Sequence, residues 1–146
     1  MKRSKRLEPI SNIASKEERK AAEAFGKAQQ ALDLAKEKLE QLVGYKSEYQ
    51  NKLHQKAANG ISGVELMDYH RFIVQLDQAI GSQRQKVAES TMAFEDNKSN
   101  WQNKYSRSSA MKQVVNLHRN NEAAIESKHE QKVMDEFAAR KHQSSY

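Results

Sequence analysis

A heptad repeat of apolar residues in the first third of the chain restricts that stretch to one long amphipathic helix. From Ala21, side chains recur at alternating steps of four and three residues. This spacing places them on one narrow stripe of an α-helix, along which a second helix packs in a coiled coil. Weaker steps continue backwards through Ala14 and Ile10 to Leu7, so we expect a first helix over about residues 7–54. The stripe consists of Ala21, Phe25, Ala28, Leu32, Ala35, Leu39, Leu42, Lys46, Tyr49 and Leu53.

A second heptad repeat begins after HQKAANGISG, residues 54–63, the one place where turn residues cluster. Ser62 and Glu65 have the spacing of a capping box, in which hydroxyl and carboxylate each accept a backbone N–H at a helix start. We therefore predict a turn at 55–62 and a second helix over about 63–140. Its stripe consists of Leu66, Tyr69, Ile73, Leu76, Ile80, Gln83, Val87, Ser90, Phe94, Asn97, Trp101, Lys104, Ser108, Met111 and Val115.

The two stripes match if the chain reverses near Gly60, because residues whose numbers sum to about 119 then face each other. We predict an all-α fold, a long antiparallel two-helix coiled-coil hairpin that forms a single domain over residues 1–146. A compact three-helix bundle is the alternative, but neither Gly nor Pro interrupts the chain after Ser82. The expected pairs are Leu53 with Leu66, Tyr49 with Tyr69, Leu42 with Leu76, Leu39 with Ile80, Ala35 with Gln83, Leu32 with Val87 and Phe25 with Phe94.

The second helix is longer than the first and should overhang it. Leu7 pairs near Met111, which leaves the segment from about Gln113 to Arg140 without a partner. This segment still has good helix formers and an apolar residue on most turns. We expect it either to bind an external groove or to fray in isolation. Its apolar residues are Leu117, Ala124, Ile125, Val133, Met134 and Phe137.

Half of the net charge of +6 comes from the first eight residues, which contain the bases Lys2, Arg3, Lys5 and Arg6 and one acid, Glu8. Elsewhere acids and bases alternate at helical spacings, which indicates solvated surface and argues against nucleic-acid binding. Docking of the basic N-terminus on anionic lipid or on an acidic partner stays open. There is no run of about 18 apolar residues and no apolar core behind the basic start, so we expect a soluble chain that is not exported through a signal peptide.

No combination of residues indicates catalysis. The chain has no cysteine, which excludes disulfides, thiolate zinc sites and cysteine nucleophiles. Gly26 and Lys27 lack the other residues of a phosphate-binding loop. His118, Glu122 and His129 have helical spacings but no third ligand converges on them. We predict a protein that is not an enzyme and that binds neither a metal nor a cofactor.

Aromatic residues gather near the turn and suggest a protein-binding surface. Tyr45, Phe72 and Ala79 lie one step off the stripes, beside stripe residues at similar heights. A two-helix coil cannot fully bury such side chains, and exposed aromatic residues on a rigid helix are typical of interface anchors. The alternative is that they only widen the hydrophobic stripe. We call this set the turn-end patch, and it consists of Leu42, Tyr45, Tyr49, Phe72, Leu76 and Ala79.

Four segments resemble the flagellar export protein FliJ family: MKRSKRLEPI, LEQLVGYKSEYQNKL, NGISGVELMDYHRFI and EQKVMDEFAAR. The resemblance covers nearly the whole chain. It implies a non-enzymatic component of the flagellar type III export apparatus, with a coiled coil similar to the central stalk of rotary ATPases. It places the protein in the cytoplasm, peripheral to the inner membrane at the flagellar base, with a membrane association that is indirect, through its partners.

The resemblance also implies partners, which are the hexameric export ATPase FliI, the export-gate protein FlhA and export chaperones. The turn-end patch would bind the export gate. Residues near the C-terminus would contact the ATPase ring: Gln131, Lys132, Asp135, Glu136, Phe137 and Arg140. A basic coiled-coil adaptor that binds nucleic acid and a self-assembling structural coiled coil are the alternatives in other functional classes.

Overall fold

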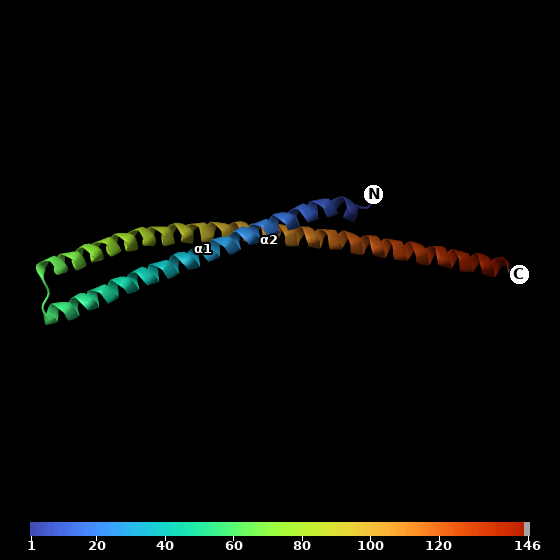
Figure 1. Ribbon diagram of the computed structural model, residues 1–146. Helices are drawn as coiled ribbons and strands as arrows, with labels where there is room; N and C mark the ends of the chain where they lie inside the picture. Colours follow the sequence, from blue (N-terminus) through green and yellow to red (C-terminus); the bar gives the residue numbers. More distant parts are fainter. Residues whose placement is uncertain (145–146) are drawn as a thin grey trace. The chain divides into compact units, whose positions relative to one another are not determined.

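The computed structural model describes residues 1–144 and contains two α-helices and no strand in that range. Helix α1 spans Arg3–Asn59 and helix α2 spans Gly63–Ser144 (Figure 1). The predicted all-α class, with two antiparallel helices of which the second is longer, is therefore confirmed. The structure divides into unit 1, Met1–Ala21 with Trp101–Tyr146, and unit 2, Ala22–Asn100. The single domain over residues 1–146 stays a prediction.

The turn in unit 2 is shorter than the predicted 55–62, because α1 continues to Asn59. Ala57 and Ala58 are strong helix formers, so the clustered polar residues before them do not end the helix. The helix ends at Gly60, whose φ of 96° is accessible to glycine at little cost. Its N–H donates to the Ala57 carbonyl at 3.4 Å, which closes the last turn.

Helix α2 starts with only half of the predicted capping box. The Ser62 hydroxyl accepts from the Glu65 N–H at 3.2 Å, as expected. The Glu65 carboxylate, however, pairs with the Lys56 ammonium across the turn at 3.2 Å. Hydrogen bonding by Glu65, with a smaller contribution from Tyr69, raises the pKa of Lys56. The Glu65 carboxylate thus links the two helices at the turn and does not cap α2.

Both predicted stripes of unit 2 form its hydrophobic interior. Each predicted stripe residue from Phe25 to Leu53 and from Leu66 to Asn97 is buried or partly buried. The predicted pair Phe25 and Phe94 has ring centroids 5.2 Å apart, and Tyr49 and Tyr69 are 6.0 Å apart. The register that the sequence predicts is therefore the observed one. The most buried apolar side chains are Leu32, Ala35, Leu76 and Ile80.

Gln83 is a polar residue inside this interior, with 5% of its surface exposed. Its side-chain nitrogen donates to the Ala35 carbonyl at 2.9 Å. A buried side-chain amide without a hydrogen-bond partner is costly, and a shifted register would separate Gln83 from the Ala35 carbonyl. This bond therefore favours the observed register over shifted ones.

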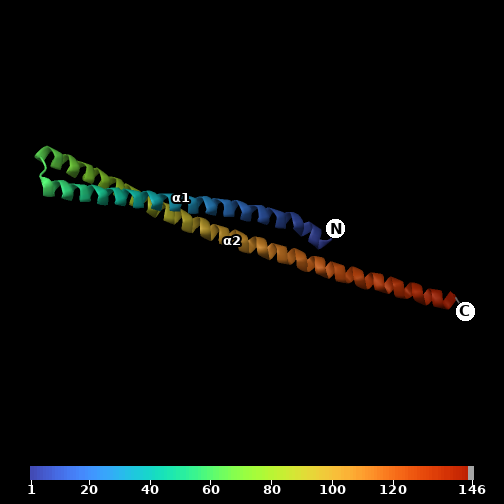
Figure 2. The same cartoon turned by 60° about the horizontal axis from the view of Figure 1, so that its bottom comes forward.

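In unit 1, the start of α1 lies beside α2, and α2 then continues past it (Figure 2). Helix α1 begins at Arg3 and not near residue 7. The predicted position of Ile10 on the stripe is wrong, because Ile10 is 46% exposed whereas Ser11 is buried. A strict heptad phase from Ala14 reaches Ser11, Leu7 and Ser4, and small serines there allow the two helices to approach closely.

Polar contacts join the two segments of unit 1. The Trp101 indole N–H donates to Glu18 at 3.0 Å, and Lys104 pairs with Glu17 at 3.4 Å. Arg119 pairs with Glu8. Because of the longer α1, the overhang starts later than the predicted Gln113: Val115 is buried, and only residues 123–143 are all exposed.

Candidate partner-binding surfaces

The turn-end patch is an aromatic cluster that both helices of unit 2 contribute to. The rings of Tyr49 and Phe72 are in tilted contact, with centroids 4.3 Å apart and an angle of 35° between the rings. Tyr49 also contacts Tyr69, so its ring is held from two sides. The structure therefore brings the two halves of the predicted patch together through one fixed aromatic ring.

Members of the turn-end patch differ in how accessible they are. Tyr45 is 51% exposed and Phe72 is 38% exposed, whereas Leu76 is 7% exposed. Leu42, Tyr49 and Ala79 are partly buried. A partner can therefore contact Tyr45 and Phe72 directly, while Leu76 packs between the helices and supports them.

Residues outside the prediction border this cluster. A shallow hollow of about 230 Å³ is lined by Tyr49, Asp68, Tyr69 and Phe72. The Lys52 ammonium lies 5.4 Å from the centre of the Tyr49 ring, within reach of a cation–π interaction. Tyr69 was recognisable from the sequence because it faces Tyr49 in the predicted register, but no pattern indicated Asp68 or Lys52.

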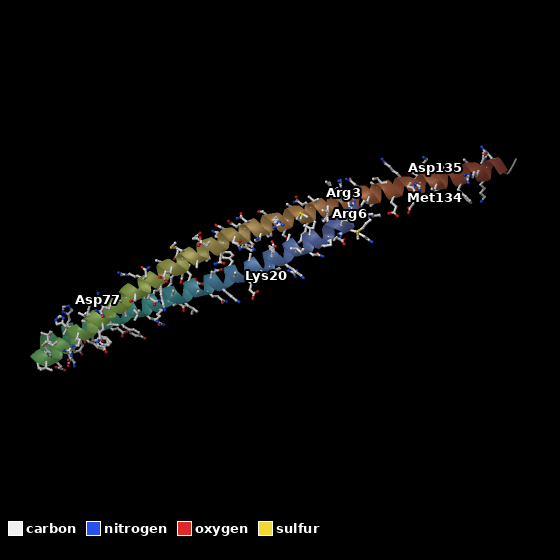
Figure 3. The ribbon with its side chains drawn as sticks, turned by 90° about the horizontal axis from the view of Figure 1, so that it is seen from above. Arg3, Arg6, Lys20, Asp77, Met134 and Asp135 are labelled. Atoms are coloured by element: carbon white, nitrogen blue, oxygen red, sulfur yellow. The ribbon has the colours of Figure 1, made fainter. Side chains whose placement is uncertain are left out.

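The predicted ring-contact residues all lie on the exposed overhang of α2. Figure 3 marks Met134 and Asp135 on this stretch, past Arg3 and Arg6 of α1. At about 100° per residue, Phe137 is separated from Asp135 by about 160° around the helix axis. The six residues therefore do not share one face. Phe137, 68% exposed, shares its side with Val133 and Met134, which are 49% and 72% exposed.

Glu122, considered above as a metal ligand, has a different role. Its carboxylate accepts the backbone N–H of Ser4 at 3.1 Å and the Ser4 hydroxyl at 2.6 Å. These bonds lower the pKa of Glu122. The first N–H groups of α1 lack partners within their own helix, so Glu122 caps α1 from the neighbouring helix.

Residues 1–144 offer neither a metal-binding cluster nor a membrane-spanning helix. No three His, Cys, Asp or Glu side chains in this part of the chain are grouped so that they could hold a metal ion. Neither helix, within the same range, is apolar over enough of its length to cross a membrane.

Comparison with known sequences identifies the family to which this chain belongs. The family model described as Flagellar FliJ protein matches residues 3–145. The chain belongs to the FliJ family. It is 30% identical over 134 residues to the Flagellar FliJ protein of Escherichia coli (strain K12) and, over the same length, to that of Salmonella typhi. Each alignment covers 92% of this chain and 91% of the relative.

Membership of the FliJ family confirms the resemblance seen in the sequence. It implies a role in flagellar protein export, and thereby in flagellum biogenesis and motility. The family is a component of export and is not known for catalysis.

Proposed function

We propose that this FliJ family protein is a non-enzymatic coiled-coil component that couples the export ATPase FliI to the export gate FlhA and assists in the handling of export chaperones. It acts in the cytoplasm, peripheral to the inner membrane at the flagellar base. Its partners are proteins, and it needs no metal or cofactor.

The observation that carries this proposal is the exposed aromatic pair Tyr45 and Phe72 beside the fixed ring of Tyr49. Aromatic side chains held by rigid neighbours lose little conformational entropy on binding, which is why they dominate interface energetics. The second surface is the overhang with Phe137, Val133 and Met134. An amphipathic helix without a partner is suited to a groove on another protein.

A pull-down with immobilised FlhA cytoplasmic domain tests the first surface. Tyr45→Ala with Phe72→Ala should reduce capture of the chain by at least about tenfold, since each anchor contributes on the order of 1–2 kcal/mol. The matched control is Met67→Ala with Val74→Ala, because these exposed side chains of α2 lie outside the turn-end patch. Equal capture of all three proteins would overturn the assignment of the turn-end patch.

Capture by FliI tests the second surface separately. Phe137→Ala with Met134→Ala should weaken binding to the FliI hexamer without changing binding to FlhA. Ile125→Ala is the control, because Ile125 is also exposed on the overhang, at 69%, but lies on another side of the helix. If the control weakens capture as much as the test variant does, the assigned face is wrong.

A further inference from the structure

The net positive charge of this protein comes entirely from unit 1. Unit 1 carries fifteen Lys and Arg against eight Asp and Glu, a net charge of +7, whereas unit 2 carries ten against eleven. Such asymmetry within one chain indicates an anionic partner for the charged part.

One flank of unit 1 combines this charge with aliphatic side chains. The stripes of unit 1 also pass through Glu18 and His118, which are partly buried. Residues that directly precede a stripe residue lie on the same side of both helices in an antiparallel coil. In unit 1 this side includes Ile10 and Ile13 of α1, 46% and 56% exposed, and Val114 and Leu117 of α2, 40% and 60% exposed. We call it the aliphatic flank, and its basic members are Arg3, Arg6, Lys20 and Arg107.

Three of the four bases of the aliphatic flank are available to a ligand, since among the residues that the structure describes only Arg107 forms an ion pair. Within the described residues, the side chains of Arg3, Arg6 and Lys20 form no ion pair; Figure 3 marks all three on α1. The one acid on this flank, Glu17, is already paired with Lys104 at 3.4 Å and with Arg107 at 3.6 Å. The flank therefore presents uncompensated positive charge around four aliphatic side chains.

The opposite flank of unit 1 differs in kind. Residues that directly follow stripe residues there line a hollow of about 270 Å³ and include Glu8, Asn12, Lys112, Asn116 and Arg119. None of these side chains is aliphatic; Glu8 pairs with Arg119, and Lys112 gives the hollow a positive charge. One flank of the coil thus exposes aliphatic side chains and the other exposes polar ones. A surface that only contacts water has no need of this difference.

We propose that the aliphatic flank docks directly on an anionic lipid surface. Exposed aliphatic side chains bordered by Lys and Arg are the composition of helices that lie in the membrane interface. The flank contains none of the aromatic anchors that mark the turn-end patch, and protein interfaces are usually built around such anchors. Contact with the membrane would then not depend on partner proteins, so this inference stands apart from the proposed binding of FliI and FlhA.

Sedimentation of the purified full-length chain with vesicles tests the proposal. The chain should bind vesicles of phosphatidylglycerol and phosphatidylcholine and dissociate from them as the salt concentration rises. It should not bind vesicles of pure phosphatidylcholine. Reversal of the flank charges by Arg3→Glu, Arg6→Glu and Lys20→Glu should weaken binding by at least about a hundredfold, since each base near an anionic surface contributes about fivefold.

The matched control reverses three bases outside the flank, Lys5→Glu, Lys16→Glu and Arg19→Glu, and has the same net charge as the test variant. This control variant should keep most of the affinity for anionic vesicles.

The aliphatic side chains are tested separately. Ile10→Ser with Ile13→Ser should also weaken binding to vesicles, while far-UV circular dichroism shows unchanged helix content. Equal losses in both charge variants would overturn the flank, because net charge alone would then explain binding. Failure to bind anionic vesicles, with retention of DNA or an acidic polypeptide instead, would overturn lipid as the ligand.

Discussion

Single residues set the register of the coil, and Gln83 is the clearest case. Gln83→Ala should lower the free energy of unfolding by about 1–3 kcal/mol, because it removes a buried hydrogen bond and leaves a cavity. Gln83→Leu keeps the volume without a polar group and should cost less or even stabilise the protein. Urea unfolding followed by circular dichroism measures both. A larger loss for leucine than for alanine would contradict this expectation, because both variants lack the bond to Ala35 and only leucine fills the volume.

Two kinds of glycine in this chain should respond to alanine with opposite signs. Gly60→Ala should lower the free energy of unfolding by about 1 kcal/mol, because φ is positive there. Gly44→Ala should raise it by about 0.5–1 kcal/mol, since Gly44 lies inside α1 with open space where the methyl group would go. Thermal unfolding of the two variants beside the parent gives the comparison. The same sign in both would contradict the helix end assigned to Gly60.

The stripe residues could be predicted from the sequence because each heptad step is reinforced by apolar neighbours one turn away. Ile10 was misplaced because its apolar character outweighed the phase of the repeat, which passes through Ser11. Stacking of Tyr49 on Phe72 could not be predicted, since it depends on side-chain torsions and not on spacing. The accessible part of the turn-end patch, Tyr45 and Phe72, followed from their off-stripe positions.

At the scale of whole elements, the ends of the helices depend on contacts that spacing does not encode. The start of α1 is capped by Glu122, more than a hundred residues away in the chain, so local sequence placed it too late. The end of α1 was placed too early because polar residues before Gly60 were read as turn. Where a helix end is set by a local cap, as with Ser62 and Glu65, the sequence placed it correctly.

The cap formed by Glu122 predicts a pH dependence for the start of α1. The pKa of Glu122 is lower in the folded state than its ordinary value of 4.5. The ionised carboxylate therefore stabilises the folded state at pH values above the unfolded pKa, and this stabilisation is lost as the pH falls through the lower, folded pKa. Glu122→Gln should therefore increase amide exchange at residues 3–8 at neutral pH. Below the folded pKa the parent and the variant should exchange alike.

Glu126→Gln is the control for this cap. Glu126 also pairs with the start of the chain, through Lys2 at 3.4 Å, but accepts no backbone N–H of α1. Its replacement should change exchange at residues 3–8 much less. If both variants behave the same, charge near the helix start and not capping of Ser4 explains the stability.

Across the whole molecule, stability should be distributed unevenly. Unit 2 buries Leu32, Leu76 and Ile80, and each buried side chain of this kind contributes about 1.5–3 kcal/mol. The stripe of unit 1 includes serines and charged residues, so it buries less apolar surface. Native-state hydrogen exchange should show the highest protection in unit 2, less at residues 3–21, and the least at 123–144. Protection in the overhang equal to that of unit 2 would contradict this order.

The central claim is that one chain joins the export ATPase to the export gate without chemistry of its own. The most direct test immobilises the FlhA cytoplasmic domain and measures how much FliI it retains, with and without the purified chain. We expect FliI to be retained only when the chain is present, and Tyr45→Ala with Phe72→Ala to reduce the retention by at least about tenfold. Retention of FliI at the same level without the chain, or with that variant, would contradict it.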